Sequence, residues 1–281
     1  MINVQKLLID ACLAETRAGF QSLYGEIDEK IVSTAEFAGR LALENIAESS
    51  ALYHNLEHTI LVSSAGNAIL KGKELRYGGI SPHEWLHFTI AVFCHDIGFV
   101  HGICNRDDGE VFATGLEESA VEVRTEGSDA QLGPWHVDRS KQFVRERFTG
   151  TEGVDTPLVC AMIESTRFPV PEGAENKEEG HLGSLVRAAD LVGQLGDPRY
   201  LHKIPALYYE FMEIGSVEVM GYKNPEQMRR EYARFYRKMI YPHIREALDF
   251  LRVTEEGRQW ASVLFSHVYN VEQSKLPREE H

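Results

Sequence analysis

Two histidines in the segment YHNLEH have a spacing that could serve chemistry. His54 and His58 are four residues apart. On a helix, this spacing separates two side chains by about 40° around the axis and about 6 Å along it. Both imidazoles would therefore face one cavity, and neutral imidazole is the commonest metal ligand among protein side chains.

A second group of metal-ligand residue types follows an apolar run over 88–94. His95 and Asp96 come directly after this run. Adjacent side chains on a regular helix point about 100° apart, but they can approach one ion where the helix ends, and Gly98 gives the backbone freedom to turn there. Asp190 lies in the apolar segment LVRAADLVGQL, where burying a carboxylate is costly unless a positive charge compensates it.

In chain order these residues read H…HD…D, a pattern that resembles the HD superfamily of metal-dependent phosphohydrolases. YHNLEH is similar to the Y-H-N-x-x-H signature of cyclic-nucleotide phosphodiesterases and of small bacterial HD phosphohydrolases. Similar short segments follow in the expected order at 118–120 (ESA), 163–166 (IEST) and 189–191 (ADL). The resemblance covers about residues 50–200.

The resemblance implies an all-α helical bundle of the HD-domain/PDEase-like type. It makes His58, His95, Asp96 and Asp190 the metal ligands, and it makes His54 the proton donor to the leaving oxygen. One segment departs from the phosphodiesterases, because their H-D-x-x-H-P-G run is replaced by HDIGFVHG.

The residue types fit this chemistry. Imidazole and carboxylate together suit Mn, Fe, Zn, Ni or Mg, with weight towards a transition metal. Asp96 has two oxygens and could bridge a pair, so we expect one or two divalent metal ions. A metal-bound hydroxide would be the nucleophile, with Asp96 as a catalytic ligand, and a protonated His54 would donate to the departing alkoxide.

The expected function is therefore a metal-dependent phosphohydrolase that acts on a phosphodiester or a nucleotide phosphate, with a phosphodiesterase favoured because of YHNLEH. The expected partner is a small anionic phosphoester. Five further residues are candidates for positions around the metal or for substrate contacts: His101, Glu118, Thr166, Arg187 and Gln194. Arg199 and Lys203 are additional candidates for local positive charge.

Two other functions stay open. A di-iron oxygenase of the HD type would need extra histidines between the HD pair and the final Asp, for which His101, His136 and His181 are the candidates. A non-catalytic nucleotide-binding sensor would not need an intact ligand set. A further pattern, H-E-x-x-H at 83–87, matches the zinc-protease helix motif, but the later histidine of the longer protease pattern is missing, so we interpret this segment as a helix start.

Composition narrows the class of protein. The chain has 281 residues, with 29 Lys and Arg against 43 Asp and Glu, for a formal charge of −14. This acidity argues against nucleic acid and anionic membranes as partners. No apolar run approaches the roughly 20 residues of a membrane span, and four scattered cysteines suit a reducing compartment. We expect a cytoplasmic protein of unknown oligomeric state.

Helical spacing dominates the chain. We expect helices at about 2–17, 27–47, 50–71, 81–94, 117–124, 136–148, 155–166, 184–196, 200–214 and 225–251, polar loops at 101–116 and 168–183, and no strand. In the basic stretch MRREYARFYRKM, charged positions alternate with a Met/Tyr/Phe stripe, which favours a solvated helix face over RNA or partner binding. The interpretation is one all-helical domain over residues 1–281, with an HD core at about 50–200 and a helical extension at about 200–281.

Overall fold

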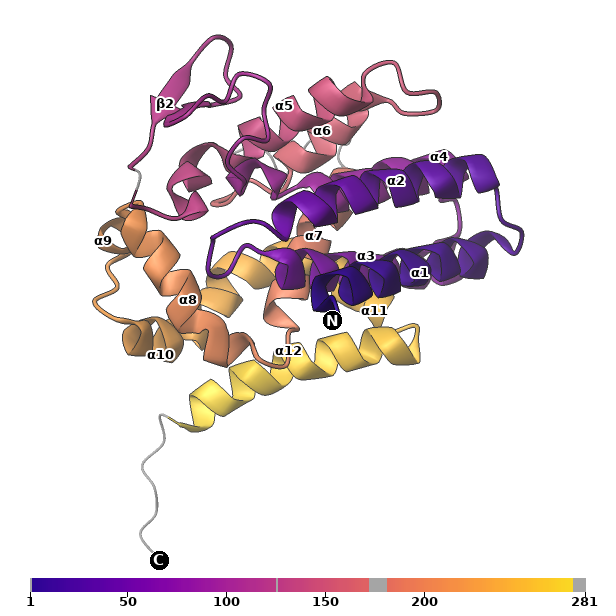
Figure 1. Cartoon of the computed structure of the whole chain (residues 1–281). Coiled ribbons are helices and arrows are strands. Elements are labelled where there is room, and N and C mark those ends of the chain that lie inside the picture. The colour runs from indigo at the N-terminus through magenta and orange to yellow at the C-terminus, as the bar shows by residue number, and fades with distance from the viewer. Residues whose placement is uncertain (1, 125, 172–180, 275–281) are drawn as a thin grey trace, which may run out of the picture.

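Three helices form the centre of the computed structural model, which describes residues 2–124, 126–171 and 181–274 (Figure 1). They are α3 (Leu56–Tyr77), α4 (Pro82–Cys94) and α7 (His181–Leu195). All side chains of α4 from Trp85 onward are buried, as its apolar run predicts. The α3 and α7 backbones approach so closely that a Cβ on Gly193 would lie 2.6 Å from Cα of Val62.

The remaining helices surround this centre, and the all-α prediction is confirmed. They are α1 (Val4–Tyr24), α2 (Glu29–Ile46), α5 (His136–Phe148), α6 (Thr156–Glu164), α8 (Tyr200–Glu213), α9 (Ser216–Met220), α10 (Pro225–Phe235), α11 (Tyr241–Leu251) and α12 (Glu255–Gln273). Short 3-10 segments, η1 (Ile97–Phe99) and η2 (Asp129–Trp135), follow α4 and precede α5. Within the described residues, no helix combines the length and apolarity that crossing a membrane requires.

The expected helix at 117–124 is wrong. This segment contains strand β2 (Ala120–Glu122), which pairs antiparallel with β1 (Val111–Ala113). Alternating valines suit a half-buried strand better than a helix, and Val123 packs with Phe112 in a small separate apolar cluster. The turn between the strands contains Gly115 at φ 80°, a conformation that glycine adopts without strain.

Two expected helices have different bounds. The helix expected from Ser50 begins only at Leu56, because the side chain of Asn55 accepts hydrogen bonds from the backbone N–H groups of the first turn and caps the helix. The stretch expected to be one helix over 225–251 is interrupted by a π-helical turn, Tyr236–Ile240. Pro242 explains the interruption, because it has no N–H for the regular helical bond and its ring clashes with the preceding turn.

The apolar stripe that predicts the first helix lies mainly on its outer side. Val4, Leu7 and Leu8 are exposed, whereas the buried face of α1 carries Ile9, Cys12, Leu13, Thr16 and Phe20. The helix therefore exists as predicted, although apolar spacing alone did not identify the side that packs on α3.

A buried ion pair fixes the segment that follows the HD pair. Arg139 on α5 and Asp107 are both almost fully buried, with 2.9 Å between Nη2 and Oδ2. The same guanidinium donates hydrogen bonds to the backbone carbonyls of Gly98 and Val100, and Asp107 accepts one from the backbone N–H of Ala113. One arginine thus holds η1 and the residue that follows it in place.

We predict that Arg139→Met destabilises the protein by about 3 kcal/mol or more, because it leaves the Asp107 carboxylate buried without its partner. Arg145→Met is the matched control on the same helix, because Arg145 is exposed and makes no ion pair with the described residues, so its expected effect is within about 0.5 kcal/mol. Urea unfolding measures both. Equal stability of the two variants would contradict this role of Arg139.

Candidate metal centre

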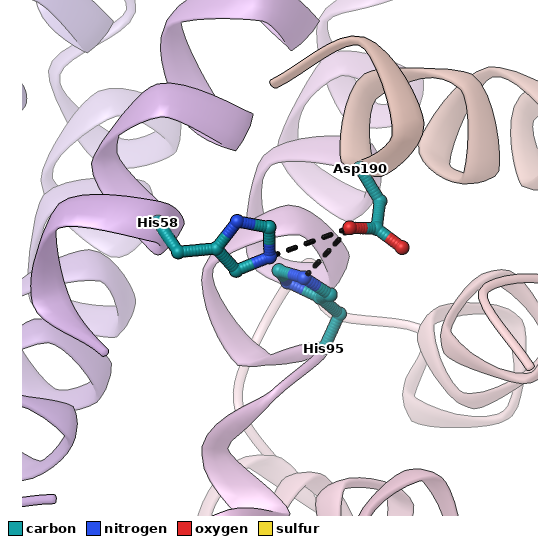
Figure 2. Close-up of side chains that lie close together, drawn as sticks. All are labelled: His58, His95 and Asp190. Atoms are coloured by element: carbon teal, nitrogen blue, oxygen red, sulfur yellow. Dashed lines mark ion pairs between the residues drawn. The ribbon is translucent and has the colours of Figure 1, made fainter. Parts of the chain in front are cut away.

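The predicted ligands come together from three separate parts of the chain. His58 lies in the first turn of α3, His95 and Asp96 end α4, and Asp190 lies midway along α7. Figure 2 shows His58, His95 and Asp190 pointing toward one another. Nε2 of His58 is 3.4 Å from Oδ1 of Asp190, and Nε2 of His95 is 3.6 Å from the same oxygen.

Asp96 completes the group. Its Oδ2 lies 3.2 Å from Nε2 of His58 and 3.1 Å from Nε2 of His95. Despite these distances, none of these three buried atoms has a hydrogen-bond partner with acceptable geometry among the described residues. Buried polar atoms normally have partners, so the donor set fits a cation placed between them.

The tautomer of His95 supports the same conclusion. Its Nδ1 lies 2.8 Å from the carbonyl oxygen of Val92, which can only accept, so Nδ1 carries the proton. In the neutral ring, Nε2 then directs a lone pair into the group of ligands. A backbone carbonyl that orients a histidine in this way is typical of metal sites.

The electrostatics of the four residues favour binding a cation. Burial tends to raise the pKa of Asp190, but the close imidazoles of His58 and His95 outweigh burial and lower it to about 2. The pKa of Asp96 shifts in the same direction. Burial would raise it, but His95 and His58 outweigh burial and hold it well below the ordinary value. Burial lowers the pKa of His95, but the two carboxylates outweigh this and hold it well above the ordinary value. Both carboxylates are therefore anionic, and without a metal ion the site retains a proton.

His54 lies before α3 and not on it, so the helical argument for its orientation was wrong. It still lies beside the ligands, with its ring centroid 5.5 Å from that of His58. The reason is a residue that the sequence analysis missed. Glu210 on α8 accepts hydrogen bonds from Nδ1 of His54 at 2.5 Å and from the backbone N–H of Tyr53 at 2.6 Å.

Glu210 also sets the charge of His54. Burial lowers the pKa of His54, but the charge and hydrogen bond of Glu210 outweigh it and raise the pKa to about 9. A signal for Glu210 existed in the sequence, because it falls on the buried side of α8 with Ile204 and Leu207. A carboxylate at such a position requires a donor or a positive charge.

His136, one of the three histidines considered as extra ligands of an oxygenase, lies beside the ligands. Its Nε2 lies 3.8 Å from Oδ1 of Asp96, and its Nδ1 is within 2.5 Å of the carbonyl oxygen of Gly133. The ring of Phe99 is stacked between His136 and His54, at 4.5 Å from each. Because Nδ1 donates to a carbonyl, Nε2 of neutral His136 presents a lone pair to a carboxylate oxygen, an arrangement that requires a proton, a water molecule or a cation between the two.

Gly98 explains how His136 reaches this position. A Cβ at residue 98 would lie 1.9 Å from the carbonyl oxygen of His136, so only glycine permits the contact. Ser140 strengthens it, since its hydroxyl donates to the His95 carbonyl at 2.7 Å and accepts from the Gly98 N–H at 2.9 Å. The sequence analysis gave Gly98 a role in turning the chain, whereas the structure shows a role in close packing.

The other candidate residues lie around the site or away from it. Glu118 is exposed in the β1–β2 turn and pairs with Arg106, and none of the contacts described for it reaches the four ligands. The hydroxyl of Thr166 donates to the carbonyl of Ile163 at the end of α6, which is a capping role.

Three further candidates have partners of their own. Nδ1 of His101 is 3.4 Å from Asp129, Arg187 donates to the carbonyl of Ser165 at 2.6 Å, and Gln194 donates weakly to the hydroxyl of Tyr200 at 3.4 Å. None of these contacts reaches the four ligands. The side chain of His181 lies outside the described residues, and Arg199 and Lys203 both pair with Glu57.

The H-E-x-x-H segment does not form a second metal site in the described residues. Glu84 accepts hydrogen bonds from Ser81 and completes a capping box at the start of α4. His87 Nε2 accepts a hydrogen bond from the backbone N–H of Asp155 at 2.8 Å. Both residues therefore stabilise local structure.

We predict that the affinity for Zn²⁺ or Mn²⁺ rises with pH between 6 and 8, by about tenfold per unit for each proton displaced. The sign follows from His95, whose raised pKa means that the ion must displace a proton. Titration calorimetry at several pH values measures this. Asp96→Asn should weaken metal binding by more than about 100-fold, which exceeds the loss typical of residues that only hydrogen-bond to a ligand. Asp108→Asn is the control, because Asp108 is an exposed acidic residue with no described contact to the four ligands. An affinity independent of pH would contradict the assignment.

Comparison with known proteins gives a family but no named activity. No curated protein and no solved structure matches the chain. One family model, described as Npun_R2479-like, matches residues 2–274. This match spans every helix described above, including α8 with Glu210. The chain therefore belongs to the Npun_R2479-like family.

Proposed function

We propose that this protein is a metal-dependent phosphohydrolase of the HD type that cleaves a phosphodiester or a nucleotide phosphate. The observation that carries the proposal is the meeting of His58, His95, Asp96 and Asp190. In this group, Nε2 of His58, Nε2 of His95 and Oδ2 of Asp96 are buried without a hydrogen-bond partner among the described residues. A divalent cation bound by them would lower the pKa of a water molecule and offset negative charge on phosphoryl oxygens.

The open side of the site determines where a substrate enters. His58, His95 and Asp96 are almost fully buried, whereas the side chain of the fourth ligand, Asp190, is 17% exposed. The side chains of His54 and His136 are 17% and 24% exposed. A small anionic phosphoester would therefore approach across these two imidazoles. Positive charge at this entrance comes from His54, which Glu210 keeps protonated at neutral pH.

His54 is suited to act as the general acid. Its Nδ1–H is donated to Glu210, so the remaining proton on Nε2 is available to a leaving alkoxide. A pKa of about 9 keeps the acid loaded and still far more acidic than an aliphatic alcohol. Glu210 orients the ring and stabilises its charge, and it does not need to change protonation state.

A di-iron oxygenase is the second candidate, and the position of His136 favours it. One additional imidazole nitrogen faces the second oxygen of Asp96 at 3.8 Å. His136 could therefore supply one of the extra histidine ligands that a second ion would need. The same geometry serves a two-ion phosphohydrolase. Oxygen consumption by the iron-loaded protein would favour the oxygenase.

The first test compares bis-(p-nitrophenyl) phosphate with p-nitrophenyl phosphate in the presence of Mn²⁺. We predict cleavage of the diester in preference to the monoester, and loss of both activities in Asp96→Ala, which serves as the blank. Release of p-nitrophenolate measures turnover. Protein that holds metal but turns over neither ester nor any cyclic nucleotide would contradict the proposal.

A second test isolates the acid. His54→Asn should keep the metal and slow cleavage of esters with poor leaving groups by about 10²–10⁴-fold, with a smaller effect on p-nitrophenolate esters, which need little protonation. Glu210→Gln should act in the same direction because the pKa of His54 falls. Equal slowing for all leaving groups would remove His54 from this role.

A further inference from the structure

The helical stretch from α10 to α11 is rich in exposed basic side chains, in a chain of net charge −14. Residues 225–245 contain six basic and two acidic residues. We call the exposed basic side chains of this stretch the basic face: Arg229, Arg230, Arg234, Arg237, Lys238 and Arg245. From Arg230 to Arg245 it extends about 22 Å at the rise of a helix.

Ion pairing within the described residues does not account for this concentration of charge. Arg237 pairs with Glu272 of α12 at 2.5 Å, and Arg234 has a long contact of 3.9 Å with Glu231. The other four members make no ion pair with the described part of the chain. Clustered like charges without partners oppose compact folding, so an external anion is the simplest stabilising partner.

Exposed aromatic rings accompany the basic face. Tyr241 is 40% exposed at the start of α11, and Phe265 and Tyr269 on α12 are 38% and 61% exposed. The rings on α12 lie alongside the basic face, because the Phe265 ring is 6.4 Å from that of Tyr236 and because α12 supplies the partner of Arg237. In Figure 1, α10 and α12 lie near each other at the lower edge of the molecule.

We infer that the basic face and these rings bind single-stranded nucleic acid without sequence preference. Arginine binds phosphate oxygens with two parallel hydrogen bonds, and exposed aromatic rings stack on unpaired bases of any sequence. An acidic protein segment would use the arginines but would leave the rings without a role. The net acidity of the chain excludes general coating by nucleic acid and confines binding to this face.

The face is separate from the metal centre, so this inference does not depend on the proposed phosphohydrolase. None of its residues contacts His54, Glu210 or the four ligands in the interactions described. Metal content and phosphoester cleavage should therefore be unchanged in variants of the basic face.

The experiment measures fluorescence anisotropy of a labelled 20-nucleotide oligo(U) titrated with the full chain between 50 and 200 mM NaCl. We expect saturable binding that weakens with salt, since each phosphate contact contributes about −0.7 to the slope of log K against log salt. The triple variant Arg230→Gln/Arg234→Gln/Lys238→Gln should weaken binding at least about tenfold at 50 mM NaCl and make the slope less steep by about 2. The control Lys6→Gln/Lys71→Gln/Lys73→Gln changes the net charge equally and should bind like wild type.

Stacking is tested separately. Tyr269→Ala should weaken binding to oligo(U) by about fivefold or more and leave the weaker binding to a duplex of the same length unchanged. Thermal unfolding monitored by circular dichroism verifies that each variant is folded. The inference is overturned if wild type does not bind oligo(U), if the two triple variants lose affinity equally, or if polyglutamate of the same charge competes as well as oligo(U). Binding to anionic vesicles alone would also overturn it.

Discussion

The constraint on which this structure depends is the meeting of four metal-ligand side chains in the hydrophobic core. Two imidazole nitrogens lie 3.1–3.6 Å from the oxygens of two carboxylates, and three of these atoms, on His58, His95 and Asp96, are buried without a hydrogen-bond partner among the described residues. Such a group is strongly unfavourable in a dry interior unless protons or a cation compensate it. We therefore interpret the surrounding helices as a scaffold that stabilises a charged site.

Several features of the scaffold serve that site directly. The capping of α3 by Asn55 places His58 in the first turn, and Ser140 holds the backbone at the end of α4. Arg139 with Asp107 fixes the chain after the HD pair. Residues beyond 200 also contribute directly to the site, because Glu210 on α8 orients His54. The C-terminal helices are in this sense part of the candidate active site.

The sequence was sufficient for the parts of the fold that depend on local pattern. The buried α4 and the all-α class follow from apolar runs and helical spacing, whereas the grouping of His58, His95 and Asp190 follows from the resemblance to the HD superfamily. The hairpin at 111–122 was missed because two three-residue strands give too short an alternation to distinguish from a helix. Glu210 was missed, and His136 was named only as a candidate ligand of an oxygenase, because their roles depend on packing between segments far apart in sequence. The first helix shows the same limit, because the spacing of its apolar residues predicts a helix but does not identify which side of that helix packs on its neighbours.

The most direct test of the account is the anomalous scattering of zinc in crystals of the full chain grown with Zn²⁺. The account predicts a peak about 2.0–2.2 Å from Nε2 of His58, Nε2 of His95 and an oxygen of each of Asp96 and Asp190. A second peak between Asp96 and His136 would establish a two-ion centre. Zinc bound elsewhere with no peak among these four residues would contradict the central claim that this core cluster is a metal centre.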